Sequence, residues 1–542
     1  PEAITLGGVS RKGIGFGLSG IADWTSPQPF LDVVKTARPW TGHLPGQWGG
    51  YPTENFSKEG WLDENGWLKD MPPGLESAGL LMLTDLPENA GGVAGRYRIT
   101  WQGKGKFTLA GRAQNSVLGD HIGHFDFTPG GGLVEIKILS TDPANPLRNF
   151  SVVREDRAAL LDAGQVFNPD WLARIRGTEL VRFMDWAMTN NSTLAQVADR
   201  PRIDDYTWVS RGVPPEIMVA LANELDADAW FTMPHLADDA LVRDYATVAR
   251  DGLEPGRRAW IEYSNEVWNF SFAQAGWADQ QARALWGRDN LWLQFYAKRA
   301  SEVADLWADT FDDPDRLVRV IATQTGWIGL EDQILHPDRL GIKTADHFDA
   351  YAITGYFSGR LGEEDKRPLV QGWLAESRAM AEAQAEAQGL THAAQADFVV
   401  RHRFDAAIPR AIAELRDGSE SGKRDDTLAA LQGDVMTYHR DVAQKNGLAL
   451  AMYEGGTLVV GIGPLVDDQD LTEFLIAVNY SDGMGALYQE LLAGWAALTD
   501  TPFNAFVDVA APSKWGSWGA LRHLGDDSAR WRALSQADPG SR

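Results

Sequence analysis

The sequence IEYSNEVWN, from Ile261 to Asn269, begins as an apolar run and then places an asparagine directly before a glutamate, Glu266. A second stretch, LALAMYEGG, from Leu448 to Gly456, has the same form and ends in Glu454 followed by two glycines, which allow a sharp turn. Short apolar runs of this kind are typical of buried parallel strands. Polar residues at the carboxyl ends of such strands meet at one edge of the sheet, so both glutamates are predicted to face one cleft.

Two carboxyl groups in one cleft are what the cleavage of a glycosidic bond requires. One group protonates the leaving oxygen while the other attacks or stabilises the anomeric carbon. Asn265, directly before Glu266, is expected to hydrogen-bond the 2-hydroxyl of a bound sugar. Simpler roles are open to each residue: Glu266 suits a helix N-terminus, Asn265 could cap the backbone, and Glu454 could be a solvated turn acid. Two such motifs in one chain favour the catalytic interpretation.

These motifs resemble those of the clan A glycoside hydrolases. Members of this clan are retaining enzymes built on a (β/α)8 barrel, whose acid/base Glu follows an Asn at the end of strand 4 and whose nucleophile Glu ends strand 7. The resemblance implies that Glu266 is the acid/base and Glu454 the nucleophile. It is a resemblance to the clan rather than to one numbered family, and it leaves out roughly residues 50–155.

The same resemblance assigns roles to residues on two other strands. In LVRFMDW, Leu180 to Trp186, it implies a strand 2 whose Arg182 holds the nucleophile ionised and oriented. An ordinary buried ion pair with Asp185 or another acid is the alternative for this arginine. Tyr356 and Tyr351, both in the predicted strand 6, compete for the position beside the nucleophile, and Tyr356 lies nearer the end of that strand.

Tryptophan is the residue type from which we expect sugar-binding surfaces. The chain has 22 tryptophans, more than core filling leads us to expect, and indole faces stack on pyranose rings. Trp268 adjoins the proposed acid/base, and Trp515 and Trp518 fall where the clan often has a stacking tryptophan after strand 8. We predict that these three bind substrate, with Trp186 and Trp327 next in order.

Histidines offer one binding candidate and one weak metal candidate. His235 ends the predicted strand 3 and could donate to a sugar hydroxyl, although an exposed surface histidine is an equal alternative. His121 and His124, in DHIGHFDF, have a spacing that suggests a metal site, but a turn with exposed imidazoles explains them equally well. The nucleotide-binding patterns G-x-x-x-x-G-K-[ST] and G-x-G-x-x-G after a strand are absent from the sequence. We therefore expect neither a metal nor a cofactor.

The remaining pattern predicts an α/β fold, a (β/α)8 TIM barrel with an inserted antiparallel β-sandwich domain. Strands alternate with helices after residue 156, as in parallel α/β sheets. We expect the barrel to begin within residues 1–50, with strand 1 in Lys12–Ala22, and to continue over residues 156–542. The other strands are predicted at Ala229–Pro234, Arg258–Tyr263, Leu317–Thr323, Asp349–Tyr356 and Phe503–Val509.

Two insertions interrupt this alternation. Residues 51–155 contain short alternating runs such as RYRITW, Arg96 to Trp101, separated by glycine turns, which predicts the sandwich between barrel strands 1 and 2. An Ala-, Glu- and Gln-rich stretch near residues 365–440 predicts a helical insertion between strands 6 and 7. At 542 residues the chain exceeds what one barrel of about 250 residues needs, so both insertions fit its length.

Composition limits the partners and the compartment. Fifty Lys and Arg against 75 Asp and Glu give a formal net charge of −25, which disfavours nucleic acid and anionic membranes as partners. The chain has no cysteine, which excludes disulfides but not export. It begins at Pro1 without a leader-like segment, and no apolar run is long enough to span a membrane. We expect a mature form that is secreted, periplasmic or on the cell surface.

These observations predict a retaining glycoside hydrolase that cleaves a β-linked polysaccharide. Long insertions around the mouth of the barrel favour endo-action, although they could equally cap an exo-acting pocket. An exo-acting glycosidase or a transglycosylase on the same site is one alternative. A noncatalytic polysaccharide-binding surface protein, with the barrel as scaffold, is another. The glycan, the role of the sandwich and the oligomeric state are left open by the sequence.

Overall fold

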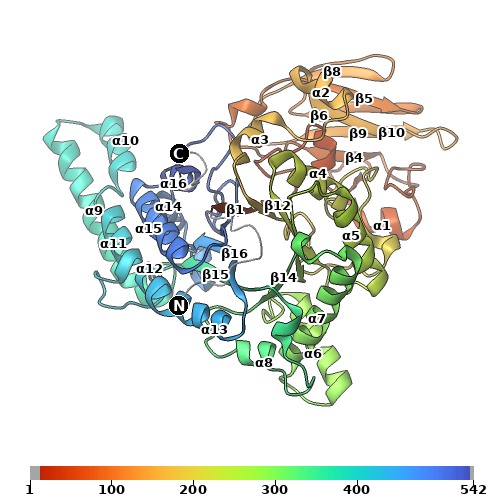
Figure 1. Ribbon diagram of the computed structural model, residues 1–542. Helices are drawn as coiled ribbons and strands as arrows, with labels where there is room; N and C mark the ends of the chain where they lie inside the picture. Colours follow the sequence, from red (N-terminus) through yellow and green to blue (C-terminus); the bar gives the residue numbers. More distant parts are fainter. Residues whose placement is uncertain (1–12, 537–542) are drawn as a thin grey trace.

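The chain folds around a closed barrel of parallel strands, which Figure 1 shows near the centre of the molecule. The computed structural model describes residues 13–536. Strand β1 pairs in parallel with both β11 and β17, which closes the ring. Within the described residues the barrel strands are β1 (Ile14–Gly17), β11 (Leu180–Arg182), β12 (Asp228–Met233), β13 (Ala259–Tyr263), β14 (Leu317–Ala322), β15 (Ala350–Phe357), β16 (Ala449–Thr457) and β17 (Phe503–Phe506).

Helices cover the outside of the barrel because each has one apolar face. In α5 (Asp239–Gly252) the buried residues recur at helical spacing, as at Leu241, Tyr245 and Ala249, and the Asp238 carboxylate caps the helix by accepting from Leu241 N. The other helices of the barrel and its loops are α2 (Ala158–Asp162), α3 (Pro169–Ile175), α4 (Pro215–Leu225), α6 (Ala273–Trp286), α7 (Trp292–Phe311), α8 (Glu331–Leu335), α12 (Leu428–Ala430), α13 (Met436–Lys445), α14 (Gln469–Asn479), α15 (Asp482–Leu498) and α16 (Ala529–Gln536).

The insertion between β1 and β11 forms two antiparallel sheets. One has the order β10-β5-β8-β7 and the other the order β3-β2-β4-β9-β6. Their inward faces share one apolar core that is separate from the barrel core. The elements are β2 (Thr41–His43), β3 (Gly50–Tyr51), α1 (Thr53–Lys58), β4 (Ser77–Met82), β5 (Gly95–Gln102), β6 (Gly105–Gly111), β7 (Gln114–Leu118), β8 (Ile122–Phe127), β9 (Val134–Thr141) and β10 (Arg148–Arg154).

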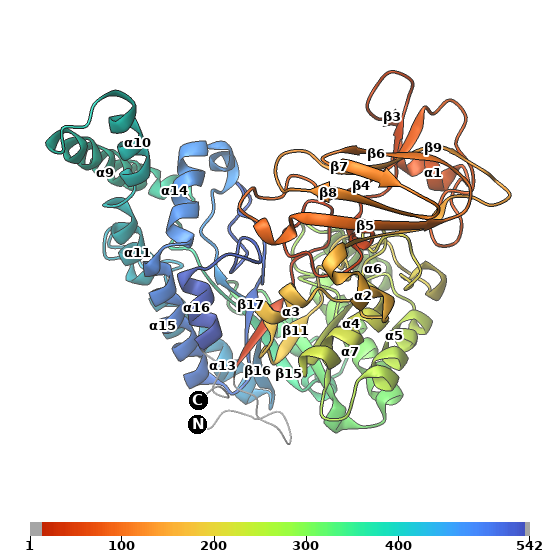
Figure 2. The same cartoon turned by 90° about the horizontal axis from the view of Figure 1, so that it is seen from above.

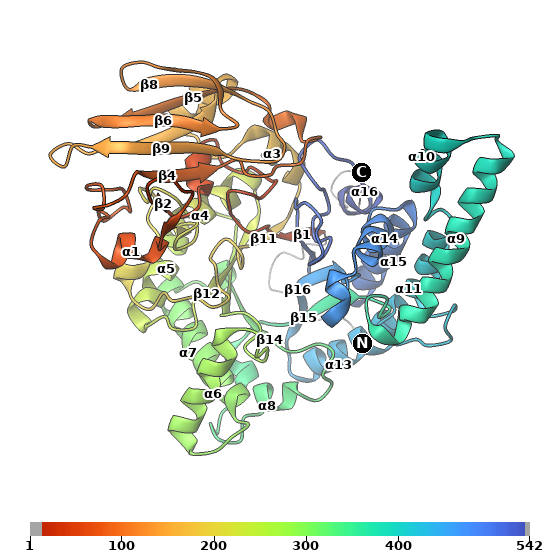
Figure 3. The same ribbon diagram turned by 180° about the vertical axis from the view of Figure 1, so that it is seen from behind.

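These inserted sheets are fixed to the barrel through the loop that follows β11. Tyr206, in that loop, stacks on Trp40 of the insert with ring centroids 5.6 Å apart, and its backbone N–H donates to Asn65 O at 2.9 Å. Trp208 N donates to Lys35 O, also at 2.9 Å. Figure 3 shows the sheets on the same side of the barrel as α4 and α5.

The second insertion, between β15 and β16, is helical. It consists of α9 (Arg367–Ala387), α10 (His392–His402) and α11 (Ala407–Asp417). Ion pairs join it to the helices that follow β16: Arg403 pairs with Glu473 of α14, and Arg416 with Glu490 of α15 at 2.9 Å. Figure 2 shows the inserted sheets and α9–α10 rising from the same end of the barrel, on opposite sides.

The predicted fold, a (β/α)8 barrel with an inserted antiparallel sandwich, is confirmed. Sheet pairing in the insert begins at Thr41, whereas the pattern placed its start at residue 51, because β2 and β3 are too short to show alternation. Barrel strand 2 ends at Arg182, four residues before the end of the predicted run. Residues 1–12 of the predicted first segment lie outside the described residues. None of the helices in residues 13–536 is long and apolar enough to cross a membrane.

Candidate active site

Glu454 lies at the carboxyl end of β16 and receives two hydrogen bonds. Arg182 Nη1 donates to its Oε1 at 2.9 Å, and the Tyr356 hydroxyl, from β15, donates to its Oε2 at 2.9 Å. The carboxyl group is buried. Both oxygens therefore act as acceptors, which favours the ionised form of Glu454.

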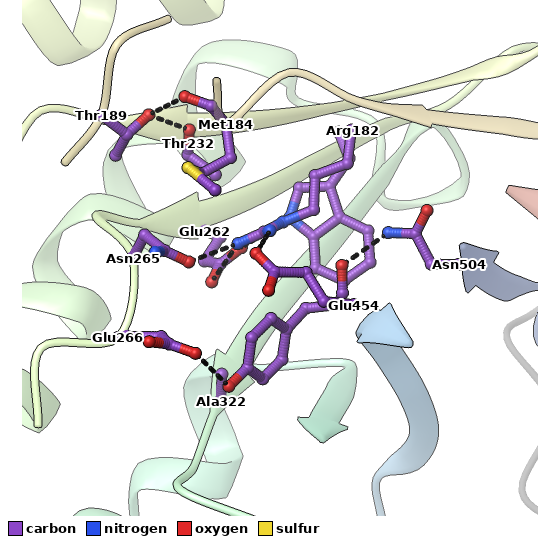
Figure 4. A network of polar contacts seen from close by, with 12 residues as sticks. Arg182, Met184, Thr189, Thr232, Glu262, Asn265, Glu266, Ala322, Glu454 and Asn504 are labelled. Atoms are coloured by element: carbon purple, nitrogen blue, oxygen red, sulfur yellow. Dashed lines mark hydrogen bonds and ion pairs between the residues drawn. The ribbon is translucent and has the colours of Figure 1, made fainter. Parts of the chain in front are cut away.

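Arg182 connects the polar side chains of the site. It ends β11, is fully buried, and contacts three side chains (Figure 4). Besides Glu454 it donates to both carboxyl oxygens of Glu262, the shortest bond being 2.9 Å, and to Asn265 Oδ1 at 2.9 Å. Trp230 Nε1 also donates to Glu262 Oε2 at 2.9 Å. The alternative partner considered for Arg182, Asp185, makes no ion pair with it; the guanidinium bridges two glutamates instead.

Carboxyl groups outnumber the cation at this site. Burial raises the pKa of Glu454 to about 8, although the Arg182 charge acts to lower it, while the charges of Glu266 and Asp185 add to the rise. Burial also raises the pKa of Glu262, and it raises the pKa of Asp185 to about 6. One guanidinium cannot balance four nearby carboxylates, so a proton is retained among them near neutral pH.

Glu266 follows β13 in an unusual backbone conformation. Its φ is +42° and that of Ser264 is +57°, both in the left-handed region that side chains other than glycine rarely adopt. The Tyr453 hydroxyl donates to Glu266 Oε1 at 3.1 Å, and Asn269 Nδ2 donates to Oε2 at 3.1 Å. Figure 4 shows Glu266 and Glu454 in one network at the strand ends. The local strain and the two donors fix the direction of the Glu266 carboxyl.

An amide network fixes the orientation of Asn265. Its Oδ1 accepts from Arg182, so its Nδ2 faces the other way and donates to Asn190 Oδ1 at 3.0 Å. Gln274, fully buried in α6, donates from Nε2 to Asn190 Oδ1 and to Asn265 O, each at 2.8 Å. Gln274 Oε1 accepts from Asn191 N at 3.0 Å. Asn265 therefore has one amide N–H left to offer a ligand.

The tyrosines and tryptophans predicted for the site have different positions. Tyr356 contacts Glu454, whereas Tyr351 is buried and hydrogen-bonds His439 at 2.8 Å. Trp518 packs edge-on against Tyr356, with centroids 6.1 Å apart, so it lies next to the nucleophile candidate. Trp515 is exposed. Trp268 packs against Tyr296 and Tyr453 and is only 7% exposed, which leaves it little surface for stacking on a sugar.

The histidines do not form a second centre. His235 is buried with its edge against Trp277, its Nδ1 has no hydrogen-bond partner, and burial lowers its pKa to about 4, so the ring is neutral. His121 is an exposed residue of the inserted sheets whose Nε2 donates to Gly103 O at 3.0 Å, and His124 Nε2 lies 3.5 Å from Glu155 Oε1. No group of three or more His, Asp or Glu side chains that could hold a metal occurs within residues 13–536.

Sequence reasoning missed Glu262, Asn190 and Gln274. The available signal for Glu262 was an acid inside the apolar run AWIEY, since a buried acid needs a partner. Asn190 and Gln274 lie in a loop and a helix with no strand end to mark them.

Comparisons with known proteins add little to this geometry. No protein-family model matches the chain. No curated protein matches it in sequence. Among solved structures, a GH26-CBM35 β-(1,4)-mannanase from Podospora anserina aligns over 94% of this chain and 96% of its own, at 10% identity and a TM-score of 0.23. At that score the alignment supports no argument, so the fold rests on the strand topology alone.

Proposed function

We propose that the protein is a retaining glycoside hydrolase of the clan A type that cleaves a β-linked polysaccharide internally. Glu454 is the nucleophile and Glu266 the acid/base. The observation that carries the proposal is the environment of Glu454: Arg182 and Tyr356 each donate to one of its oxygens at 2.9 Å, at the barrel end where Glu266 also lies.

The reaction proceeds in two displacements. In the first, Glu266 gives its proton to the glycosidic oxygen as a Glu454 oxygen attacks the anomeric carbon, so that the leaving sugar departs and a glycosyl ester forms. In the second, ionised Glu266 takes a proton from water, and the resulting hydroxide oxygen displaces Glu454. Each displacement inverts the anomeric carbon, so the configuration is retained overall.

The single retained proton suits this cycle. The mechanism assigns the proton in the reactive state to Glu266, because both oxygens of Glu454 already accept hydrogen bonds, from Arg182 and Tyr356. Asn265 directs its remaining N–H to the sugar 2-hydroxyl, where a contact strengthens in the transition state. Trp518, against Tyr356, borders the sugar that reacts. We also propose that the enzyme acts outside the cytoplasm, where polysaccharide substrates occur.

Product analysis on a panel of β-glucans, mannans, xylans and sulfated algal glycans tests the proposal. Wild type should release oligosaccharides from one polymer, and NMR of the first product should show the anomeric configuration of the substrate. Inverted product would exclude Glu454 as nucleophile. Products longer than the starting oligosaccharide would identify a transglycosylase.

A further inference from the structure

Exposed aromatic side chains gather at the mouth of the barrel. Within the described residues, the tryptophans and phenylalanines that are more than half exposed are Trp24 (62%), Trp48 (61%), Phe270 (57%), Trp327 (58%) and Trp515 (65%). Four of these, all except Trp48, lie in loops that directly follow barrel strands. Single exposed aromatic residues are normal on protein surfaces, but several of them around the end of the barrel that holds the candidate carboxyl groups point to a ligand-binding surface.

The strand order places these four residues in two opposite pairs. Trp24 follows β1 and Trp515 follows β17, which are neighbours in the closed barrel. Phe270 follows β13 and Trp327 follows β14, also neighbours. In a ring of eight strands, β13 and β14 stand four places from β17 and β1, so the pairs lie across the mouth from each other. Glu266, which follows β13, and Glu454, near the end of β16, lie at the same end of the barrel.

The two insertions leave open the line across the barrel mouth that joins the two aromatic pairs. The inserted sheets are fixed to the loop after β11 through Tyr206 and Trp208, and the helical insertion is fixed to α14 and α15, which follow β16. Figure 2 shows them on opposite sides of the same barrel end. Neither insertion is built on the loops after β13, β14 or β17, where three of the aromatic residues lie.

The charges of the site limit which glycans can bind across the barrel mouth. The floor of the site holds Glu262, Glu266, Glu454 and Asp185 against the single cation Arg182. At the rim, Lys514 lies over the Trp515 ring at 4.9 Å, but it pairs with Asp467 at 2.7 Å. With a net charge of −25, the protein repels carboxylated or sulfated chains.

We propose that Trp24 with Trp515, and Phe270 with Trp327, are sugar-stacking platforms on the two sides of the carboxyl pair, and that their ligand is an uncharged linear glycan. The chain lies across the mouth, with sugar units bound on both sides of the cleaved bond. The inference rests on the proposed function and deepens it, because binding on both sides of the bond is what internal cleavage requires.

The test compares Trp327→Ala with Trp515→Ala on an end-labelled oligosaccharide of the polymer that wild type cleaves. Removing a platform weakens binding on one side, so the two variants should shift the cleaved position in opposite directions along the oligosaccharide. Each should lower kcat/KM on the polymer by about threefold to tenfold, and less on the shortest cleaved oligosaccharide. Trp48→Ala is the matched control, equally exposed but in the turn between β2 and β3, and should change neither quantity.

Shifts in the same direction, or no shift in either variant, would overturn the two-sided arrangement. Preferred cleavage of an anionic or a cationic polymer would overturn the uncharged ligand. If wild type hydrolyses no glycan, the proposed function fails separately, and quenching of tryptophan fluorescence by soluble neutral glycans then decides the inference. Binding that both alanine variants weaken would sustain the platforms, and the absence of binding to wild type would reject them.

Discussion

The barrel and the inserted sheets each bury a glutamate against a basic side chain, but they do so differently. In the barrel, Glu454 accepts from Arg182 at 2.9 Å while other carboxyl groups crowd the same cation. In the insert, Glu135 on β9 meets His43 on β2, with Glu135 Oε2 and His43 Nε2 2.6 Å apart. The second ring nitrogen of His43 is also occupied, because it accepts a hydrogen bond from Gly49 N at 2.8 Å.

The surroundings of the insert pair leave no room for a ligand. Glu135 covers Gly79 so closely that a Cβ there would lie 2.1 Å from its Oε2. One acid faces one basic partner, and each ring nitrogen of His43 is used. The barrel site instead has more acids than cations and lies at strand ends. An unbalanced charge cluster with an open side, rather than burial alone, therefore distinguishes Glu454 as the candidate for the reactive carboxyl.

The largest expected effect comes from Glu454→Gln, which should lower kcat by about 10⁴-fold or more, since an amide cannot form the ester intermediate. The fold should remain, as judged by circular dichroism. Burial raises the pKa of Glu454 to about 8, and the folded carboxyl cluster therefore holds a proton that the unfolded chain has lost, so wild-type stability should fall between about pH 4.5 and 8. Urea unfolding of the variant should show a smaller decline, to which Glu262 and Asp185 still contribute because burial raises their pKa values as well. Normal turnover in the variant would remove the assignment.

Glu266→Gln should lower kcat/KM by about 10²- to 10⁴-fold on a polysaccharide, because the leaving oxygen loses its proton donor. An aryl glycoside with an acidic phenol needs little protonation, so its bond-breaking step should slow far less. The measurement is the ratio of the activity loss on the polysaccharide to the activity loss on the aryl glycoside. Equal losses on both substrates would indicate that Glu266 does not act as the acid.

Gln274→Leu should lower kcat/KM by about tenfold, since it leaves the Asn265 carbonyl without this donor, leaves Asn190 Oδ1 with Asn265 Nδ2 alone, and loosens the Asn265–Glu266 turn. Gln294→Leu is the matched control: Gln294 is buried in the neighbouring helix α7 and bonds Asp338 and Arg339 instead. Both variants should lose similar stability in thermal melts. If they also lose similar activity, Gln274 has no positioning role.

Glu262→Gln should move the acidic limb of the kcat/KM profile to lower pH. Without the negative charge of Glu262, the positive charge of Arg182 acts more fully on Glu454 and lowers the pKa of Glu454. In the wild type, the pKa that defines this limb should lie above the ordinary glutamate value of about 4.3. Glu414→Gln, which alters a buried glutamate paired with Lys366 in the helical insertion, should leave the limb unchanged. A limb that moves upward in Glu262→Gln would contradict the charge argument.

The smallest effect on activity is expected from Glu135→Gln. Breaking the buried pair with His43 should lower the free energy of unfolding by about 1–3 kcal/mol while leaving kcat/KM within twofold of wild type. Urea unfolding and steady-state kinetics measure the two quantities. A large loss of activity at full stability would mean that the insert contributes to the reaction and that the contrast with the barrel is wrong.

Strand ends were the predictable part of this molecule. The apolar runs before Glu266 and Glu454 placed these residues in the loop just after β13 and near the carboxyl end of β16, because a parallel strand needs apolar residues on both faces. The contacts between Glu454 and both Arg182 and Tyr356 match the positions that the clan resemblance implied, although the roles of these residues stay predictions.

Side-chain packing was the unpredictable part. Nothing in the sequence around Trp268 distinguishes a buried ring from an exposed one, and its burial follows from Tyr296 and Tyr453, which are distant in sequence. The contacts of Gln274 could not be predicted for the same reason, since its partners Asn190 and Asn191 lie in the loop after β11. One sequence gives the ends of elements, whereas these contacts depend on how the elements meet.

The closure of the barrel has a consequence for how the chain acquires its structure. The seam joins Ile14 of β1 to Phe503 of β17, so both insertions and the other six barrel strands are synthesised between the two partners. The inserted sheets, between Thr41 and Arg154, emerge from the ribosome complete while β1 still lacks both neighbours. Until translation reaches β17, β1 keeps one edge open to pairing with other chains. An assembled β1 therefore exposes this edge until β17 has been made.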